Sequence, residues 1–308
     1  MSEGPVVVLA GGTGGAKLAR GMLDVVGEDL VVVANTADDT EIYGVAVSPD
    51  PDLVTFTLAD IIDARGWGID GDTFSEMDRR RQEGEEAWFN LGDRDLGWCR
   101  RRSELLAEGL SPTEAMAQLA GSLGVAARVL PMTDEPVRTE ITVEGRRLGL
   151  QEFLIREGAR GPVDRIEFAG IGSARPTDEV VEALGQARAI VIGPSNPVIS
   201  IGPILALPGM LPALASAAAP VVAVSPIVGG KVLKGPTAAC MEAWGLPATT
   251  DGVARAWATA ADLLIADEPA PDAPVPVRVA PSLMDTPQSR EALAREALAA
   301  ADAISVQP

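Results

Sequence analysis

Short apolar runs alternate with helical patterns at the start of the chain. Val6–Ala10 and Leu30–Ala34 are uninterrupted apolar runs of strand length, which is typical of strands buried on both faces of a sheet. Between them, Lys17–Val26 carries apolar residues at helical spacing, and Gly27 follows where a helix would end. A strand, a helix and a second strand in this order predict a βαβ unit of a parallel sheet.

The same alternation returns in the second half. Four further apolar runs have the length of buried strands: Ile166–Ala169, Ala189–Ile192, Val221–Val224 and Leu263–Ala266. Helices are predicted over Thr177–Leu184 and over the alanine-rich Gln288–Ala303, and the proline-rich stretch Ala270–Pro276 predicts a loop. The pattern therefore predicts strands and helices that continue the first unit.

The middle of the chain has a different texture. Residues 61–124 combine tryptophans, charge and helical periodicity, with Ser111 as the first residue of a capping-type helix start. Val129–Ile155 alternates in polarity, and Glu144-Gly145 predicts a hairpin turn. We therefore expect an α/β fold with a Rossmann-like, mostly parallel sheet and helices on both faces. Residues 1–60 and 165–308 would form this core, and 61–164 a mostly helical or mixed insertion that covers it.

Composition narrows the function classes. The 308 residues include 25 basic and 44 acidic side chains, a net charge of −19, and no long basic run, which argues against nucleic-acid binding. No histidine is present, so histidine-based acid–base catalysis, Ser-His-Asp triads and His-ligated zinc are excluded. Cys99 and Cys240 form no metal-ligand spacing, and neither a signal peptide nor a membrane span is evident. We expect a reduced, cytoplasmic setting with no membrane contact.

All three lysines lie in glycine-rich loops that follow apolar runs. Lys17 ends the first loop, and Lys231 and Lys234 lie in the last. Backbone N–H groups of such loops approach anions closely, and an ammonium adds a compact charge, so the pattern predicts a phosphate-rich ligand at the carboxyl ends of parallel strands. The residues of the first loop that we expect to bind it are Gly11, Gly12, Thr13, Gly14 and Lys17. The alternatives are an arginine-biased composition that kept three lysines by chance, and a tight turn needed only for helix–strand packing.

The first loop departs from two familiar phosphate loops. Lys17 replaces the last glycine of a dinucleotide fingerprint, and Asn35 replaces the acidic residue expected at the end of the second strand. A P-loop needs Ser or Thr after the lysine, but Leu18 follows here. The loop therefore indicates phosphate binding of neither ordinary kind.

Carboxylates follow the second apolar run in two groups. Asp38 and Asp39 come directly after it, where a metal–phosphate site forms in a parallel sheet, although either could equally cap a helix. Asp50 and Asp52 lie in Ser-Pro-Asp-Pro-Asp, which we read as a turn stiffened by two prolines; an ordinary Asx-type turn is the alternative.

Two later motifs add polar groups. Leu-Gly-Asp-Arg-Asp contains Asp93 and Arg94. Arg94 could form a bidentate contact with a phosphate or carboxylate, or the motif could be a solvated helix start with internal ion pairing. Gly-Pro-Ser-Asn-Pro-Val-Ile-Ser places Ser195, Asn196 and Ser200 in a rigid loop after a predicted strand, where they can hydrogen-bond a nucleotide or its phosphates.

Together these motifs resemble one family. Gly-Gly-Thr-Gly-Gly-Ala-Lys-Leu, Asn-Thr-Ala-Asp-Asp, Ser-Pro-Asp-Pro-Asp, Leu-Gly-Asp-Arg-Asp, Leu-Pro-Met-Thr-Asp, Gly-Pro-Ser-Asn-Pro-Val-Ile-Ser and Ser-Pro-Ile-Val-Gly-Gly-Lys occur in the order seen in the 2-phospho-L-lactate transferases of coenzyme F420 biosynthesis. The resemblance runs from about Val6 to Met284, nearly the whole chain.

The resemblance implies a reaction. A guanosine-diphosphate-activated three-carbon acid, lactyl or enolpyruvyl, would pass its phospho-acid to the ribityl hydroxyl of the deazaflavin Fo, with release of GMP and with the help of Mg²⁺. Asp38 and Asp52 would hold the metal or orient the hydroxyl. The residues implied near Fo are Asp52, Asn90, Asp50, Asp93 and Arg94, and those implied near the nucleotide are the first glycine loop, Ser195, Asn196, Ser200 and Lys231. The resemblance also implies a homodimer.

Some positions depart from the family pattern. Asn90 stands where some members carry a basic Fo contact, Tyr43 stands where many carry histidine, and Trp98-Cys99 stands at another such position.

Two other functions are alternatives to this transferase. A nucleotide-sugar-binding regulator would continue with glycine and serine after Asp39, but Thr40–Tyr43 follows. An NAD oxidoreductase would need the fingerprint that Lys17 and Asn35 break.

Overall fold

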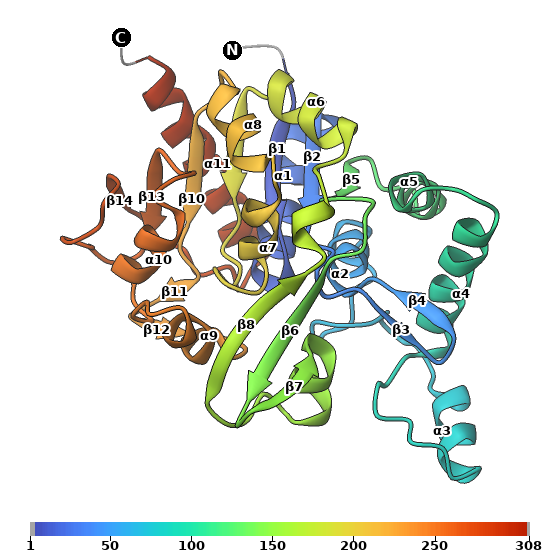
Figure 1. Cartoon of the computed structure of the whole chain (residues 1–308). Helices are drawn as coiled ribbons and strands as arrows, with labels where there is room; N and C mark the ends of the chain where they lie inside the picture. Colours follow the sequence, from blue (N-terminus) through green and yellow to red (C-terminus); the bar gives the residue numbers. More distant parts are fainter. Residues whose placement is uncertain (1–3, 307–308) are drawn as a thin grey trace.

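The structure is a computed structural model, and it describes residues 4–306. Within this range the centre of the molecule is a seven-stranded, entirely parallel sheet (Figure 1). Its order is β14 (Val277–Val279), β13 (Leu263–Ala266), β10 (Val221–Val224), β9 (Ala189–Ile192), β1 (Val6–Ala10), β2 (Leu30–Ala34) and β5 (Arg128–Pro131). The predicted α/β class with a Rossmann-like parallel sheet is confirmed.

Helices cover both faces of this sheet. Because successive strand residues point to opposite faces, Val6 and Val8 pack on one side of β1 and Val7 and Leu9 on the other. One face is covered by α1 (Gly12–Val26), α2 (Pro49–Leu58) and α11 (Pro287–Ser305), and the other by α6 (Asp178–Gln186), α7 (Ile201–Ala206), α8 (Met210–Ser216) and α10 (Thr250–Trp257). The uninterrupted apolar runs follow from this double burial.

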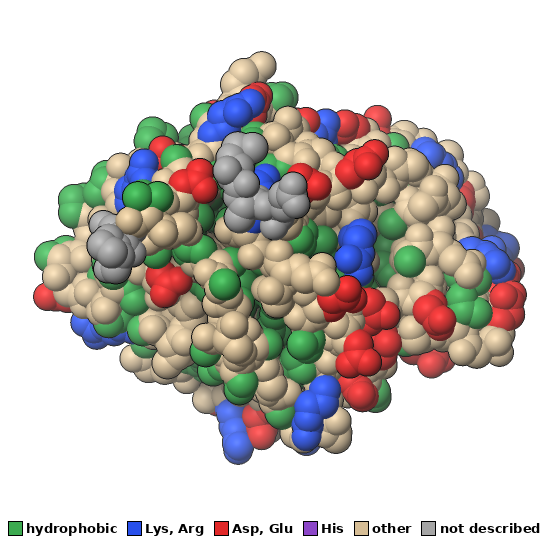
Figure 2. Space-filling model, turned by 90° about the horizontal axis from the view of Figure 1, so that it is seen from above, with side chains coloured by type: hydrophobic (Ala, Val, Ile, Leu, Met, Phe, Trp, Pro, Cys, Tyr) green, Lys and Arg blue, Asp and Glu red, His purple; other side chains and the backbone are tan. Residues whose placement is uncertain are grey.

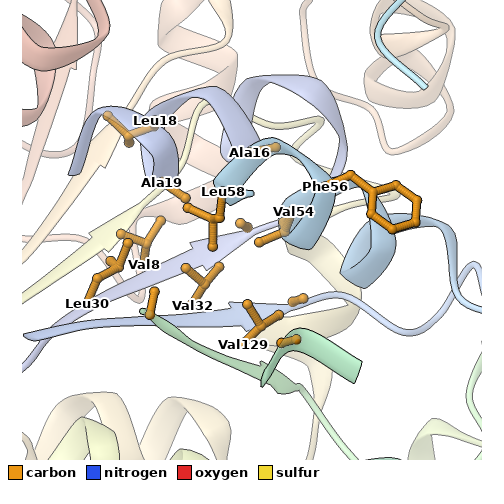
Figure 3. Close-up of a cluster of buried hydrophobic side chains, with 14 of the residues drawn as sticks. Val8, Ala16, Leu18, Ala19, Leu30, Val32, Val54, Phe56, Leu58 and Val129 are labelled. Carbon is orange, nitrogen blue, oxygen red and sulfur yellow. The ribbon is translucent and has the colours of Figure 1, made fainter. Parts of the chain in front are cut away.

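The first face is tightly packed beneath the candidate site. Leu18 and Ala19 of α1 and Val54 of α2 lie over Val8 and Val32 of the strands (Figure 3). All five side chains are fully buried. Two helix N-termini are thereby fixed against the sheet, which matters because both begin at its carboxyl edge.

The segment 61–164 is only partly separate from the sheet. Its helices are α3 (Ser75–Gln82), α4 (Asp93–Ala107) and α5 (Pro112–Ser122), the last with the predicted capping box at Ser111. Its strand β5, however, pairs in parallel with β2 and forms the edge of the central sheet. The segment therefore contributes to the core as well as lying beside it.

A second, antiparallel sheet lies below the main one in Figure 1. Its order is β7 (Arg146–Gly149), β6 (Arg138–Val143) and β8 (Val163–Ala169), and the predicted turn at Glu144-Gly145 joins β6 to β7. We predicted Ile166–Ala169 as the strand with which the parallel sheet resumes, and this is wrong: β8 pairs antiparallel with β6. Its residues are partly exposed, unlike those of the central strands, because only one face of the small sheet is covered.

Shorter elements surround the carboxyl edge of the main sheet. These are the hairpins β3 (Thr40–Ile42)–β4 (Val45–Val47) and β11 (Ile227–Val228)–β12 (Lys231–Val232), helix α9 (Thr237–Ala243) and the π-helix Glu152–Arg156. Two 3₁₀ turns lie elsewhere, at Gly27–Asp29 before β2 and at Ile171–Ser173 after β8. The predicted stiff turn at residues 48–52 is in fact a helix start: Pro49 opens α2, where its fixed φ and missing N–H cost nothing.

The surface is acidic. On the face shown in Figure 2, acidic side chains gather in one group, while lysines and arginines are scattered. An anionic ligand must therefore be held by local backbone N–H groups and single cations rather than by a general positive field. Among residues 4–306, no helix has both the length and the apolar character needed to cross a membrane.

Candidate functional site

Two cavities meet at the carboxyl edge of the sheet. The first, which we call the glycine-loop cavity, has a volume of about 520 Å³ and is lined by Gly11–Gly14, Lys17, Ser195 and residues beyond β10 and β14. The second, the aromatic cavity, has a volume of about 450 Å³ and is lined by Phe56, Trp67 and Phe89, among others. Asp38, Asp50 and Leu154 line both cavities. The two cavities are therefore adjacent, and the carboxylates of Asp38 and Asp50 lie where they meet.

The N-terminus of α1 forms one wall of the glycine-loop cavity. Gly11 is the N-cap and Gly12–Lys17 form the first turns, so the predicted loop is in fact a helix start with its first N–H groups at the cavity. The Gly12 N–H donates to Asp50 Oδ1 at 2.6 Å, and the Gly11 N–H donates to Ser195 Oγ at 3.4 Å. The structure therefore brings the first glycine loop together with Ser-Pro-Asp-Pro-Asp and with Gly-Pro-Ser-Asn-Pro-Val-Ile-Ser.

The loop after β9 is shaped by its own polar groups. Asn196 Oδ1 accepts from the N–H groups of Val198 and Ile199, and its Nδ2 donates to Thr237 Oγ1 at 3.2 Å. Ser195, Asn196 and Ser200, which we expected to bind a nucleotide, all line the cavity. Asn196 uses both ends of its amide to hold the loop, so its contribution to binding comes chiefly from loop shape.

The fold places two of the three lysines at the glycine-loop cavity and the third outside it. Lys17 and Lys234 line the glycine-loop cavity, and Lys17 Nζ donates to Met284 O at 3.1 Å. The pKa of Lys17 is lowered, first by burial and then by the nearby charges of Lys234 and Arg290. Lys231, which we expected to neutralise phosphates, is an exposed residue of β12 outside the residues that line the cavity. Two ammonium groups held near each other favour a polyanion between them.

Gly14 offers a test of this loop packing. A Cβ at this position would lie 1.9 Å from Pro194 O, so Gly14→Ala must push the β1 and β9 loops apart. We expect a destabilisation of roughly 1–3 kcal/mol, the typical range for overpacking, and weakened ligand binding. Gly97→Ala is the control, because Gly97 lies exposed inside α4 with nothing near its Cβ position, and it should gain about 0.5–1 kcal/mol. Urea denaturation of both variants measures this, and equal stabilities would contradict it.

The aromatic cavity is largely apolar. Phe56 packs edge-on to Trp98 with ring centroids 5.2 Å apart, and the Arg65 guanidinium lies 4.3 Å over the Trp67 ring. Trp67 is 43% exposed at the wall. Asn90 also lines this cavity, and its Oδ1 accepts from Arg81 Nη2 at 2.7 Å. A cavity with such a lining suits a planar aromatic ligand with a few polar atoms.

Asp38 is the least satisfied carboxylate at the junction. It is 7% exposed; its Oδ2 accepts from Gln151 Nε2 at 3.3 Å, and its Oδ1 has no protein partner in the described chain. Burial raises the pKa of Asp38 well above its ordinary value, and the charges of Asp50 and Asp39 raise it further. A buried carboxylate oxygen with no partner is a place where a cation would be stabilised.

Asp50 lies beside it with both oxygens in hydrogen bonds. Its Oδ1 accepts from the Gly12 N–H and its Oδ2 from Asn35 Nδ2 at 2.9 Å. Burial raises the pKa of Asp50 to about 6, although these two hydrogen bonds act in the opposite direction. Asn35, which replaces the acidic residue of a dinucleotide site, thus helps to hold a carboxylate at the junction.

Asp52 has a different environment. Arg102 Nη1 donates to Asp52 Oδ2 at 3.0 Å, Arg102 Nη2 pairs with Oδ1, and Trp98 Nε1 donates to Oδ1 at 2.7 Å. Both members of the ion pair are buried. The charge of Asp52 is therefore already matched inside the protein, in contrast to that of Asp38.

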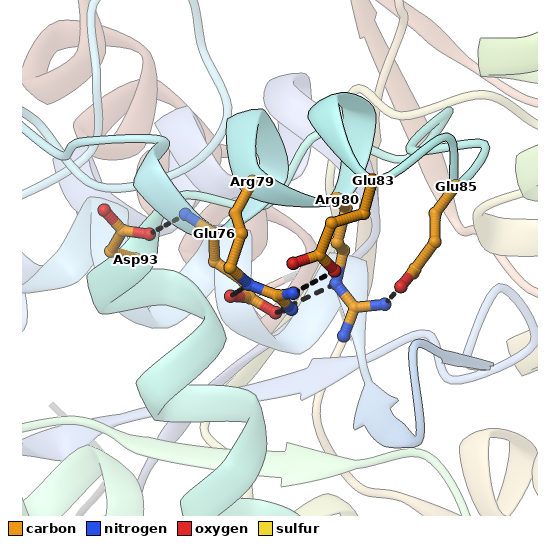
Figure 4. Close-up of polar contacts among 6 residues, drawn as sticks. All are labelled: Glu76, Arg79, Arg80, Glu83, Glu85 and Asp93. Atoms are coloured by element: carbon orange, nitrogen blue, oxygen red, sulfur yellow. Dashed lines mark hydrogen bonds and ion pairs between the residues drawn. The ribbon is translucent and has the colours of Figure 1, made fainter.

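Asp93 and Arg94 lie outside both cavities. Asp93 accepts from Thr73 Oγ1 and from the N–H groups of Ser75 and Glu76, so it caps α3 (Figure 4). Arg94 is exposed, and its Nη1 donates to Asp70 O at 3.1 Å. The geometry of Leu-Gly-Asp-Arg-Asp therefore matches a helix start rather than an anion-binding motif.

The donor set fits a magnesium ion only in part. Within residues 4–306 no group of three or more His, Cys, Asp or Glu side chains is placed to hold a metal. Mg²⁺ at phosphate sites, however, usually takes one or two carboxylates and completes its shell with phosphate oxygens and water. The unpartnered Oδ1 of Asp38, with Asp50 beside it, matches that requirement; Asp52, already paired with Arg102, matches it less well.

Several lining residues were not predicted. Asp95 lines the aromatic cavity, and its pKa is raised to about 7, first by burial and then by Asp52 and Asp72. Lys234 was visible in the sequence only as one of the three lysines. Leu154 of the π-helix and Ser282–Asp285 after β14 carry no local signal, because only the tertiary fold brings them to the cavities.

These features define a Rossmann-like α/β protein with its site at the carboxyl ends of the strands, where such sheets place their ligands. A family model described as "2-phospho-L-lactate transferase CofD" matches residues 6–302. The chain belongs to this family, which confirms the resemblance stated from its motifs.

Individual relatives agree. The chain is 38% identical to a 2-phospho-L-lactate transferase of Methanosarcina mazei, over 85% of this chain and 87% of the relative. It is 37% identical to a phosphoenolpyruvate transferase of Kitasatospora aureofaciens, over 97% and 98% of the two chains. A Bacillus halodurans crystal structure of a UPF0052 family protein shares the fold, with a TM-score of 0.56 at 18% identity over 95% of this chain and 91% of that one.

Proposed function

We propose that this protein transfers a phospho-acid group from a guanosine-diphosphate-activated three-carbon acid to the ribityl hydroxyl of the deazaflavin Fo, with release of GMP. Its family membership supports a 2-phospho-L-lactate or phosphoenolpyruvate transferase. The observation that carries the finer proposal is the pair of cavities that share Asp38 and Asp50. Transfer of a group between two substrates needs two adjacent binding cavities that meet where the group is transferred.

The residues around the glycine-loop cavity suit the donor. The N–H groups of Thr13 and Gly14 in the first turn of α1, with Lys17 and Lys234, would hold the diphosphate, because oriented N–H groups and ammonium charges stabilise phosphate oxygens. The wall beyond β10 would hold the nucleoside. The aromatic cavity would hold Fo, with its planar ring against Phe56 and Trp67 and its ribityl chain directed to the junction.

Asp38 and Asp50 would hold Mg²⁺ on the diphosphate. The ion, when bound, would neutralise charge that develops on the leaving phosphate. The protein's own part is positional: the Gly12 N–H and Asn35 fix Asp50, and Gln151 fixes Asp38. We expect the reacting hydroxyl to lie within hydrogen-bond reach of Asp38 or Asp50, either of which could accept its proton.

The direct test is a product assay. The purified protein is incubated with Fo, MgCl₂ and the lactyl or enolpyruvyl donor, and the products are identified by mass spectrometry. We expect the phospho-acid ester of Fo together with an equal amount of GMP, and no product when EDTA replaces MgCl₂. The absence of turnover with both donors would remove the proposal, and product formation in EDTA would remove the metal from it.

Arg81 provides a further test of the acceptor side. Because Asn90 Oδ1 accepts from Arg81, its Nδ2 group is left as the polar end available to a ligand. Arg81→Ala removes this constraint, so we expect the KM for Fo to rise about fivefold, the worth of one hydrogen bond, with kcat little changed. Steady-state kinetics with varied Fo measures both constants.

The matched control is Arg79→Ala on the same helix. Arg79 is also exposed, but it pairs with Glu76 and Glu83 (Figure 4) and makes no hydrogen bond to Asn90. We expect no change in the KM for Fo. An equal rise in both variants would show that general loss of charge on α3, rather than orientation of Asn90, is responsible.

A further inference from the structure

One buried hydroxyl in the wall of the glycine-loop cavity has no partner. Ser282 lies between β14 and α11, is 3% exposed and lines the cavity. Its Oγ makes no hydrogen bond within the described chain. A buried hydroxyl left without a partner is destabilising, so each one in a folded protein calls for a reason.

Three other buried hydroxyls that line this cavity are already engaged within the protein. Ser225 Oγ accepts from the Ile227 N–H at 3.1 Å, and Thr237 Oγ1 accepts from Asn196 Nδ2. Ser195 Oγ accepts from the Gly11 N–H. These groups hold loops in place, whereas the hydroxyl of Ser282 holds nothing in the protein.

The segment that carries Ser282 is fixed at both ends. On one side, the Ala280 N–H donates to Ala266 O at 2.8 Å; on the other, Met284 O accepts from Lys17 Nζ. Ser282 therefore belongs to an anchored stretch of chain in the cavity wall. The same cavity is also lined by the apolar residues Pro226, Val228 and Leu283.

We propose that Ser282 Oγ is a hydrogen-bonding contact for the nucleoside part, base or ribose, of the activated donor. This rests on the proposed function. The diphosphate must lie near α1, Asp38 and Asp50, because the transferred group has to reach the aromatic cavity. The nucleoside then extends along the sheet edge, past β9 and β10 toward β14, and Ser282 is the unpartnered group that follows β14.

The experiment is calorimetric titration of wild type and Ser282→Ala with GDP and, separately, with inorganic pyrophosphate, both with MgCl₂. We expect the Kd for GDP to rise about fivefold to tenfold in the variant, as for loss of one hydrogen bond, and the Kd for pyrophosphate to stay unchanged. The melting temperature of the free variant should stay the same or rise, because an unsatisfied buried group has been removed.

Ser225→Ala is the matched control. It removes a hydroxyl that accepts a backbone N–H, so its melting temperature should fall. If Ser282→Ala binds GDP as wild type does, the assignment is wrong. It is equally wrong if the affinities for GDP and pyrophosphate fall together, which would indicate a phosphate contact or a distorted loop. If wild type binds pyrophosphate but not GDP, the proposed donor and the assignment are both overturned.

Discussion

Asp38→Asn is expected to lower kcat/KM by at least about a hundredfold, the usual effect of removing a group that stabilises transition-state charge, while the folded protein keeps its melting temperature. Asparagine has the shape of aspartate and can still accept from Gln151, so the local packing is preserved. What is lost is a buried negative charge with one unpartnered oxygen. The variant therefore separates the chemistry of this carboxylate from its place in the fold.

Its stability is expected to hold because the charge of Asp38 has no matching cation in the protein. Burial and the neighbouring carboxylates Asp50 and Asp39 all disfavour the charged form. Replacing a buried, uncompensated carboxylate with a neutral isostere removes a desolvation cost rather than adding one. Thermal unfolding without ligand measures this, and magnesium-dependent stabilisation by GDP should be much weaker in the variant than in wild type.

Asp39→Asn is the control for this experiment. Asp39 is adjacent in sequence, and burial raises its pKa to about 7, but its Oδ1 accepts from Ser48 Oγ at 2.6 Å and it lines neither of the two cavities. We expect most of the activity to remain, because asparagine can accept the same hydrogen bond. If both variants lost activity equally, the loss would belong to the β2 loop as a whole, and Asp38 would have no special part.

The central fold was predictable because its signal is local. Val6–Ala10 and Leu30–Ala34 are buried on both faces, and such strands are continuous apolar runs that a sequence displays directly. The strand at Ile166–Ala169 was misassigned for the complementary reason. A short apolar run gives no information about its partner, and here the partner is β6, in a sheet covered on one face.

Part of the site was predictable for a topological reason. Parallel strands bring their carboxyl ends to one edge, so the motifs after β1, β2 and β9 had to meet there, as Gly11, Asp38 and Ser195 do. Position along the edge and side-chain partners could not be predicted in this way. Lys231 and Lys234 are three residues apart in one loop, yet the hairpin β11–β12 brings only Lys234 to the cavity wall.

Residues far apart in sequence were the least predictable. Arg102 lies fifty positions from Asp52, on a helix of the middle segment, and nothing in either motif indicates that the two form a pair. The same is true of Ser282, whose lack of a partner is a property of the folded environment. A sequence shows which groups are available, while their pairing depends on tertiary packing.

Arg102→Met is expected to destabilise the protein by roughly 3–5 kcal/mol, the usual cost of breaking a buried ion pair from one side. Methionine fills much of the space of the arginine stem, so the principal loss is the partner of the buried Asp52 charge. Trp98 Nε1 remains as a single hydrogen-bond donor, which does not replace a guanidinium. Urea denaturation monitored by circular dichroism measures the change.

Arg101→Met is the control on the same helix. Arg101 is exposed and pairs with Glu104 and Glu108 at the surface, so its replacement should change stability by less than about 1 kcal/mol. The double variant Asp52→Asn/Arg102→Met should be more stable than the sum of the two single changes predicts. Once Asp52 is neutral, the buried charge of Arg102 has no partner, and replacing Arg102 removes that charge. Additive losses would contradict a coupled pair.

The same variants separate two roles for Asp52. If its function is to hold the wall of the aromatic cavity in place through its pairing with Arg102 and Trp98, Asp52→Asn and Arg102→Met should raise the KM for Fo in parallel with their loss of stability. If Asp52 instead contacts Fo or the metal, as the family resemblance implies, Asp52→Asn should lower kcat far more than Arg102→Met does. The buried pair in this structure favours the first outcome, because a carboxylate held by a guanidinium and an indole N–H has little remaining capacity for a second cation.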